Sequence, residues 1–246
     1  MKQIDPRRLQ ERLYSQRLRY LSELNELAHG ENEAFANDDE TCFALVHQYP
    51  YGPCASFTGY DPAFFEQVLH RYPSLNLNIS LPPGQALRVE PMRGLTQNGS
   101  YEYFAYEGEP PTAPIDPRVR LLAKEEHELV RPIMQHDAPI LNDPEALIFV
   151  CFDAEQIVGY LSCSPEWEDV WDAGNVFTLP EHRGKGIGTA LDYAYLKTMR
   201  ERGFVPYGSG VYNPASAAAA RKAGFELCCV RHAFNYKRPK LFRRRT

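Results

Sequence analysis

The stretch VFTLPEHRGKGIGT, Val176–Thr189, decides how the rest of the chain is interpreted. Its first four residues are typical of a strand, and Pro180 ends that run. Glycines recur at 184, 186 and 188, beside Arg183 and Lys185 and just before an amphipathic segment. Such a turn leaves backbone N–H groups uncovered at the start of a helix, where the helix dipole favours an anion. The stretch therefore predicts a strand, a phosphate-binding turn and a helix.

Spacing separates three kinds of phosphate loop. A P-loop requires Gly-Lys followed by Ser or Thr, but Lys185 is followed by Gly186. A dinucleotide-binding turn requires a third glycine where this chain has Thr189. The pattern present is Arg183-x-x-Gly186-x-Gly188. It resembles the acyl-CoA pyrophosphate loop of the GNAT superfamily of N-acetyltransferases.

The pattern of elements around this loop supports the resemblance. We expect the order β-α-β-β-β-α-β-α-β, with segments at 118–123, 124–135, 147–152, 157–163, a strand ending at 179, 187–202, 204–212, 213–223 and 227–236. This order resembles the GNAT fold, a mixed α/β sheet. Asn213-x-x-Ser216 and the later Gly224-Phe225 are similar to the family's late helix cap and ending. We therefore interpret residues 118–236 as a catalytic acetyltransferase domain.

Residues 1–110 predict a smaller α/β domain without a second RxxGxG loop. The expected helices are 6–28 and 61–70, the expected strands are 42–47, 54–59, 75–81 and 101–106, and 31–40 is expected to be a loop. Two interpretations stay open: a degenerate GNAT-like copy, or an unrelated packing or dimerisation domain. Four prolines between Gly108 and Pro117 predict a linker at 111–117.

Composition limits the class of protein. Hydrophobic residues make up 43% and charged residues 24%, as in ordinary soluble proteins, and no apolar run is long enough to span a bilayer. We therefore expect a cytoplasmic location and no membrane partner. The net charge is −5 although residues 237–246 are strongly basic, so a nucleic-acid partner is not expected and that tail is interpreted as a solvated terminus. Six cysteines without CxxC spacing favour packed thiols and no metal site.

The resemblance also implies how acetyl-CoA would be held. The amides of Arg183, Gly184, Lys185, Gly186, Ile187, Gly188 and Thr189 would bind the pyrophosphate. The backbone of Phe177, Thr178 and Leu179 would pair with the pantetheine arm like an added strand and polarise the thioester. Asn213 and Ser216 would reach the same arm.

Acetyl transfer requires a neutral amine, of which roughly one molecule in a few thousand is present at pH 7. A general base is therefore expected. The resemblance points to Asp172 in the strand before the loop, with Glu168 near it. Trp167 and Trp171 alternate with acidic residues. Two interpretations stay open: the indole rings and acids bind a cationic acceptor group, or the rings pack beneath a solvated acidic loop. The family's usual tyrosine acid is replaced by Ala220. Two alternatives stay open: Tyr212, Tyr207 or Tyr236 substitutes for it, or the thiolate leaves without an acid, since a thiol has a pKa near 8.5.

The function that the resemblance implies is transfer of the acetyl group of acetyl-CoA to a small-molecule amine by direct attack in a ternary complex. Two alternatives remain, namely a non-catalytic acyl-CoA sensor and a protein N-acetyltransferase that docks through the basic tail. The sequence does not name the acceptor, and a homodimer is compatible with it.

Overall fold

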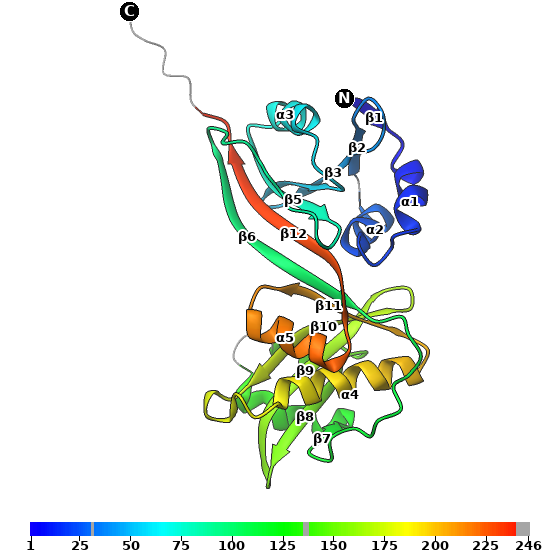
Figure 1. Ribbon diagram of the computed structural model, residues 1–246, viewed down its shortest axis with the longest axis vertical. Helices are drawn as coiled ribbons and strands as arrows, with labels where there is room; N and C mark the ends of the chain where they lie inside the picture. The colour runs from blue at the N-terminus through cyan, green and yellow to red at the C-terminus, as the bar shows by residue number, and fades with distance from the viewer. Residues whose placement is uncertain (31, 135–137, 240–246) are drawn as a thin grey trace, which may run out of the picture. The chain divides into compact units, whose positions relative to one another are not determined.

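The computed structural model describes residues 1–30, 32–134 and 138–239, which form two compact units (Figure 1). The central unit is Glu102–Cys228, and the N-terminal unit combines Met1–Tyr101 with the segment from Cys229 onward. The boundary falls within β6 (Leu95–Ala105) and β12 (Glu226–Lys237). The boundary between the units therefore lies inside two strands and not in the proline-rich segment.

The segment expected as a linker, 111–117, lies inside the central unit instead. Its prolines donate no backbone hydrogen bonds, but their carbonyls still accept them. Lys197 Nζ donates to the carbonyls of Pro111 at 2.7 Å and Ala113 at 3.0 Å. These bonds fasten the segment to a helix of the same unit.

The central unit is built on a mixed sheet in the order β6-β11-β10-β9-β8-β7. Only β10 and β11 pair in parallel; the other neighbours for which a register is resolved are antiparallel. The strands are β7 (Val119–Leu121), β8 (Leu147–Asp153), β9 (Gln156–Trp167), β10 (Val170–Thr178) and β11 (Val205–Val211). This is the predicted mixed α/β sheet.

Two helices cover one face of this sheet, α4 (Ile187–Glu201) and α5 (Pro214–Ala223). The apolar residues of α4 recur at intervals of three and four, and Ile187, Leu191 and Tyr195 are at most 3% exposed. The helix ends before Gly203, which has φ of +84°. The helix was predicted over 187–202 and is confirmed.

The segment expected as an α-helix at 124–135 is instead the 3₁₀ helix η1 (Lys124–Ile133), followed by η2 (Ala138–Asn142). Its buried residues, His127 and Val130, are three apart, which matches three residues per turn. Pro132 also removes a donor that an α-helix would use. Gln135 lies outside the described residues. A further 3₁₀ turn, η3 (Pro180–His182), leads into the glycine-rich loop.

The N-terminal unit has the strand order β1-β2-β3-β4-β5-β12. Its elements are β1 (Lys2–Ile4), α1 (Pro6–Tyr14), α2 (Leu21–His29), β2 (Asn32–Ala36), β3 (Phe43–Tyr49), β4 (Gly52–Phe57), α3 (Pro62–Arg71) and β5 (Ser74–Leu81). A buried ion pair fixes α2 to β12, because Arg231 donates to Glu23 at 3.0 Å and Glu23 is fully buried.

Three predictions for this unit were wrong. The helix expected over 6–28 is two helices, because the interval between Leu13 and Leu18 breaks the helical spacing. The expected loop contains β2, whose residues Ala34–Ala36 are buried. The strand predicted over 227–236 as part of the catalytic domain pairs with β5 over residues 230–237. Lys237 and Arg238 of the expected tail are structured here, and 240–246 lie outside the described residues.

The two units repeat one topology. In each, three antiparallel strands are followed by a helix and a parallel strand: β2-β3-β4-α3-β5 in one and β8-β9-β10-α4-β11 in the other. An antiparallel strand then pairs with the last of these, β12 with β5 and β6 with β11. Each unit therefore receives its final strand from elsewhere in the chain.

Tyr195 of α4 bridges β10 and β11 through its hydroxyl group. Its hydroxyl contacts the carbonyls of Trp171 at 2.5 Å and Tyr207 at 3.1 Å, and accepts from the Tyr207 N–H at 3.1 Å. The side chain is completely buried. The hydroxyl therefore pairs backbone groups at the last point where the two strands lie together.

We expect Tyr195→Phe to lower the free energy of unfolding by about 1–3 kcal/mol, because buried backbone groups lose a partner. Urea denaturation measures this. Tyr193→Phe is the matched control on the same helix, since its hydroxyl donates to the Ala113 carbonyl in an exposed bond at 2.8 Å. That control should cost less than about 0.5 kcal/mol. Equal losses for both variants would contradict the role assigned to Tyr195.

Candidate active site

β10 and β11 separate after a short parallel contact. They pair only from Val170 to Asp172 on β10 and from Val205 to Tyr207 on β11. Beyond this point each strand is irregular against its other neighbour, between Ala173 and Asn175 in β10 and between Gly208 and Val211 in β11. Such bulges bend strands. The result is a fork between the two strands.

The glycine-rich loop closes the open end of the fork. Gly184 and Gly186 have φ of +75° and +79°, a region that side chains rarely adopt. Gly186 caps α4 and supplies no side-chain hydrogen bond to the first N–H groups of the helix. Arg183 Nε donates to the Thr178 carbonyl at 3.2 Å, which ties the loop to the end of β10. The helix start is thus left open to an anion.

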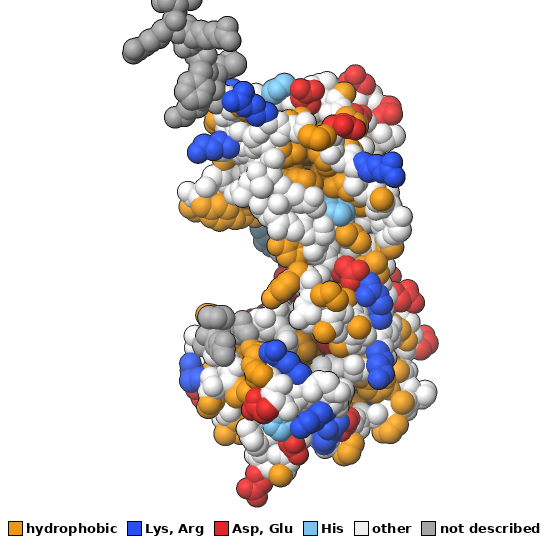
Figure 2. Space-filling model, turned by 60° about the vertical axis from the view of Figure 1, so that its left-hand side comes forward, with side chains coloured by type: hydrophobic (Ala, Val, Ile, Leu, Met, Phe, Trp, Pro, Cys, Tyr) orange, Lys and Arg blue, Asp and Glu red, His pale blue; other side chains and the backbone are white. Residues whose placement is uncertain are grey.

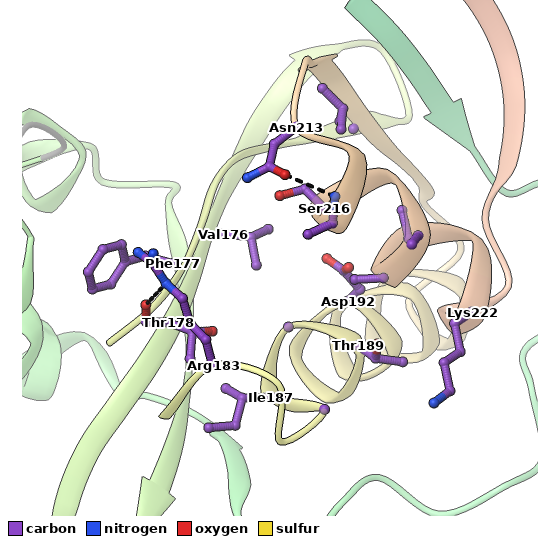
Figure 3. Close-up of a pocket in the computed structure, with 18 of the residues that line it drawn as sticks. Val176, Phe177, Thr178, Arg183, Ile187, Thr189, Asp192, Asn213, Ser216 and Lys222 are labelled. Carbon is purple, nitrogen blue, oxygen red and sulfur yellow. Dashed lines mark hydrogen bonds between the residues drawn. The ribbon is translucent and has the colours of Figure 1, made fainter. Parts of the chain in front are cut away.

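A cavity of about 700 Å³ lies between these elements (Figure 3). Most of the predicted acetyl-CoA contacts line it: Phe177, Thr178, Arg183, Gly184, Gly186, Ile187, Gly188, Thr189, Asn213 and Ser216. Leu179 and Lys185 belong to the same segments but are not among the lining residues. The size is in the usual range for small-molecule sites.

Phe177 lines the cavity while its ring packs on the other side of the strand. The ring lies 5.8 Å from that of Tyr160 and points away from the cavity (Figure 3). The backbone of β10 is therefore what this position offers to a ligand. Gly159 allows the close packing behind it, because a Cβ there would lie 2.8 Å from the Phe177 carbonyl oxygen.

Asn213 begins α5, as expected for a helix cap. Its Oδ1 accepts from the Ala215 N–H at 2.9 Å, and Ser216 follows on the same first turn beside the cavity (Figure 3). The side-chain oxygen of Asn213 is therefore used in capping the helix, and Asn213 itself lines the cavity.

Asp172 is the last paired residue of β10 at the fork. Its carboxylate accepts from the Ser209 N–H at 2.9 Å and from the Ser209 hydroxyl at 2.6 Å. Burial raises the pKa of Asp172 to about 6, against the lowering effect of the Ser209 bonds, and Glu166 raises it further. A carboxylate with this pKa is mostly ionised at pH 7 and can accept a proton.

None of the three predicted catalytic residues is among the residues that line the cavity, although Asp172 immediately precedes the lining residue Ala173. Glu168 lies in the turn between β9 and β10, at the opposite end of β10 from the loop, with φ of +49°. Tyr212 follows β11 with its side chain 78% exposed and is not among the lining residues. Ala220, which stands at the position of the family's usual tyrosine, does line the cavity.

The tryptophans settle one open alternative. Trp167 and Trp171 are each only 9% exposed, and the Trp171 ring lies 5.4 Å from that of Phe204. They are packed aromatics, so they offer no open face to a cation.

The N-terminal unit has a different helix start at the corresponding place. Asp61 caps α3, and its carboxylate accepts from the Phe64 N–H at 3.1 Å. The small cavity beside it, about 210 Å³, is also lined by Asp38 and Asp39. An acidic helix start repels phosphate, whereas the glycine cap of α4 does not.

Sequence reasoning missed Tyr195, Ser209 and Asp192. Tyr195 fits the apolar spacing of α4, which gives no signal for its hydroxyl group. Ser209 is a single hydroxyl in a strand, which carries no signal of its own. Asp192 breaks the apolar pattern of α4 at a position that lines the cavity, and this interruption was available as a signal.

Surface and side-chain chemistry add three facts. On the face shown in Figure 2, Lys and Arg side chains lie among Asp and Glu. Among residues 1–30, 32–134 and 138–239, no group of three His, Cys, Asp or Glu side chains is arranged to hold a metal ion. Within the same ranges, no helix combines the length and apolarity needed to cross a bilayer.

Comparison with known proteins points to the same family as the geometry of the cavity. The sequence model of the Acetyltransferase (GNAT) family matches residues 113–225. An uncharacterised N-acetyltransferase of Methanocaldococcus jannaschii is 30% identical over 95 residues, which cover 35% of this chain and 42% of the relative. The chain therefore spans less than half the length of that curated relative.

Two solved structures share the fold over most of the chain. A GCN5-related N-acetyltransferase from Kribbella flavida has a TM-score of 0.54 at 15% identity, covering 92% of this chain and 96% of its own. One from Sphaerobacter thermophilus has a TM-score of 0.53 at 17% identity, with coverages of 90% and 86%. The family match coincides with the segment that carries β7 to α5, the fork and the cavity. Residues 113–225 of this chain therefore belong to the acetyltransferase (GNAT) family.

Proposed function

We propose that this protein is an acetyl-CoA-dependent N-acetyltransferase that acetylates an amine of a small molecule. The observation that carries the proposal is the cavity itself. It joins an uncapped helix start to a strand edge without a partner, and a carboxylate with a pKa of about 6, that of Asp172, immediately precedes the lining residue Ala173 at the fork.

The donor would be held mainly by backbone groups. The N–H groups at the start of α4 would bind the pyrophosphate, and a charge at a helix start gains about 0.3–1 kcal/mol, or ~2 when partly buried. β10 loses its β11 partner after Asp172, so this edge is available to pair with the amides of the pantetheine arm. Asn213 and Ser216 border the same path.

The reaction removes two protons from an ammonium acceptor. The ammonium gives the first to Asp172, directly or through water, and the free amine attacks the thioester carbonyl carbon. The C–N bond forms, the C–S bond breaks, and its electron pair leaves with the coenzyme A sulfur. The second proton leaves the nitrogen of the new amide and goes to the released thiolate or to water. The Ser209 hydrogen bonds hold the carboxylate at the fork throughout.

The sulfur would leave without a dedicated acid. Ala220 stands in the cavity wall and Tyr212 is exposed, so neither supplies a proton. A thiol with a pKa near 8.5 is an adequate leaving group as the thiolate, so the missing acid forfeits part of the ~10²–10⁴ typical of acid–base catalysis.

Ala220 is also the observation that favours a second candidate, a non-catalytic acyl-CoA sensor. Release of thiol from acetyl-CoA in the presence of a panel of amines separates the two functions. Tight acetyl-CoA binding without thiol release would favour the sensor, and turnover excludes it.

We further propose that the N-terminal unit is a degenerate copy of the same fold. The repeated topology supports this, and the acidic cap of α3 explains why the copy would not hold a phosphate. The acceptor specificity would then depend on surfaces outside the donor cavity.

We expect Asp172→Asn to abolish the acid limb of the pH–rate profile. In the wild type kcat/KM should rise with pH through about 6, because the base must be ionised and its pKa is raised to that value. The variant should lose roughly 10²–10⁴ of the rate at pH 7 and keep its affinity for acetyl-CoA.

Ser209→Ala tests the same assignment in the opposite direction. Removing the hydroxyl donor at 2.6 Å weakens the carboxylate form, so the acid limb should move to higher pH. If the limb stays where it is in both variants, another group is the base.

We expect Gly186→Ala to weaken acetyl-CoA binding about tenfold or more, equivalent to ~1.4 kcal/mol. A side chain strains the backbone at φ of +79°, and relief of that strain turns the loop N–H groups away from the ligand. Calorimetric titration measures the dissociation constant.

Gly203→Ala is the matched control. Gly203 has φ of +84° and, like Gly186, open space where a Cβ would be, but it lies beyond the other end of α4. Both variants should lose similar stability and only Gly186→Ala should lose affinity. Comparable affinities for the two would contradict a phosphate site at the loop.

A further inference from the structure

Asp192 places a carboxyl group inside the donor cavity. It lies on α4, lines the cavity and is only 7% exposed. Its carboxyl group points toward Val176 and Ser216 in Figure 3. Among the described residues, no hydrogen bond or salt bridge reaches it. The carboxyl group therefore faces the cavity without a hydrogen-bond partner from the described protein residues, and a ligand that fills the cavity is placed to supply one.

The position of Asp192 relative to the loop is unfavourable for a negative charge. It follows Thr189 by three residues and therefore lies on the same side of α4, about one turn from the N–H groups that would hold the pyrophosphate. A carboxylate there would face a second anion in a site shielded from water. Like charges favour the neutral form of the carboxyl group.

We propose that Asp192 is a neutral carboxylic acid when acyl-CoA is bound, that its O–H donates a hydrogen bond to the ligand, and that binding takes up a proton. This rests on the proposed function, because it assumes that the cavity binds a diphosphate-bearing thioester. The affinity for acetyl-CoA should then fall as the pH rises.

The groups around Asp192 are consistent with this. Burial raises the pKa of Asp192 to about 7 in the free protein. The cavity-lining parts of β6, β10 and β11 carry no ionisable side chain among the described residues. The cationic lining residues are Arg183 of the loop and Lys222 of α5, and His182 of η3 also lines the cavity.

The tyrosine and the two cysteines on the core side of α4 bring no positive charge, and the carboxylate of Asp172 beside Tyr195 and Cys163 adds only negative charge. Tyr195 on the same helix has a pKa raised by burial. Cys151 on β8 and Cys163 on β9 also have thiol pKa values raised by burial. No neighbouring charge therefore compensates a carboxylate at position 192 from this side.

The direction of the effect follows from the two pKa values. Below pH 7 Asp192 is already protonated in the free protein, so binding takes up no proton. Above pH 7 it must gain one, and the association constant falls by up to about tenfold per pH unit until the higher pKa of the complex is reached.

Calorimetric titration of the full chain with acetyl-CoA at pH 8, in two buffers of different ionisation enthalpy, measures the proton uptake. At this pH the ligand phosphates are fully ionised and the thioester carries no titrating thiol. We expect uptake approaching one proton per site in the wild type. Asp192→Asn, whose amide keeps a neutral donor, should bind at pH 8 at least as tightly as the wild type and lose that uptake.

His182→Gln is the control, because His182 is the histidine among the residues that line the cavity. It should keep the uptake. The proposal is overturned if Asp192→Asn takes up as many protons as the wild type, or if the uptake disappears in His182→Gln instead. Absence of acetyl-CoA binding to the wild type at every pH would instead overturn the proposed function. Urea denaturation verifies that both variants are folded. If either variant is unfolded, the proton uptake of the wild type at pH 8 still tests the inference, because its absence would overturn it.

Discussion

The separation of β10 from β11 is the constraint on which the central unit depends. Two parallel strands that stayed paired along their length would leave no edge for a ligand and no space beneath it. Irregular pairing at Ala173–Asn175 and at Gly208–Val211 bends both strands just after their contact. The hydroxyl of Tyr195 fixes where the contact ends. Every feature of the candidate site is positioned from that point.

Backbone chemistry dominates the donor side of the cavity. The helix start offers uncovered N–H groups, the strand edge offers unpaired ones, and the lining side chains are mostly small or apolar. A glycine cap with positive φ is required because a polar side chain at that position would occupy the N–H groups itself. Asp61 does this in the N-terminal unit. One residue at the helix cap therefore distinguishes the two repeated units chemically.

Two carboxyl groups in the central unit have raised pKa values for different purposes. Asp172 keeps two hydrogen bonds from Ser209, so it remains mostly ionised at neutral pH and suits proton removal. Asp192 has no such donors and suits a neutral role. Similar burial thus gives two groups of opposite function, because only one of them receives hydrogen bonds that stabilise its charge.

The sequence by itself determined the mixed sheet of the family, the position of the glycine-rich loop and most of the cavity lining. These depend on local patterns: apolar spacing in α4, the cap at Asn213 and the spacing of glycines after Arg183. Two predictions from local patterns were wrong. The segment expected as one helix is two helices, separated near the interval between Leu13 and Leu18, and the helix that contains Pro132 is a 3₁₀ helix and not an α-helix.

Only the tertiary structure decided the rest. Which strand completes each unit depends on pairing between residues more than a hundred positions apart, such as Tyr207 with Ala105 and Val230 with Leu81, and no local signal encodes it. The environments of Asp172 and Asp192 likewise arise from packing of distant segments. A titratable side chain has the same letter in any surroundings, and burial and hydrogen-bond donors, which only the fold supplies, set its charge.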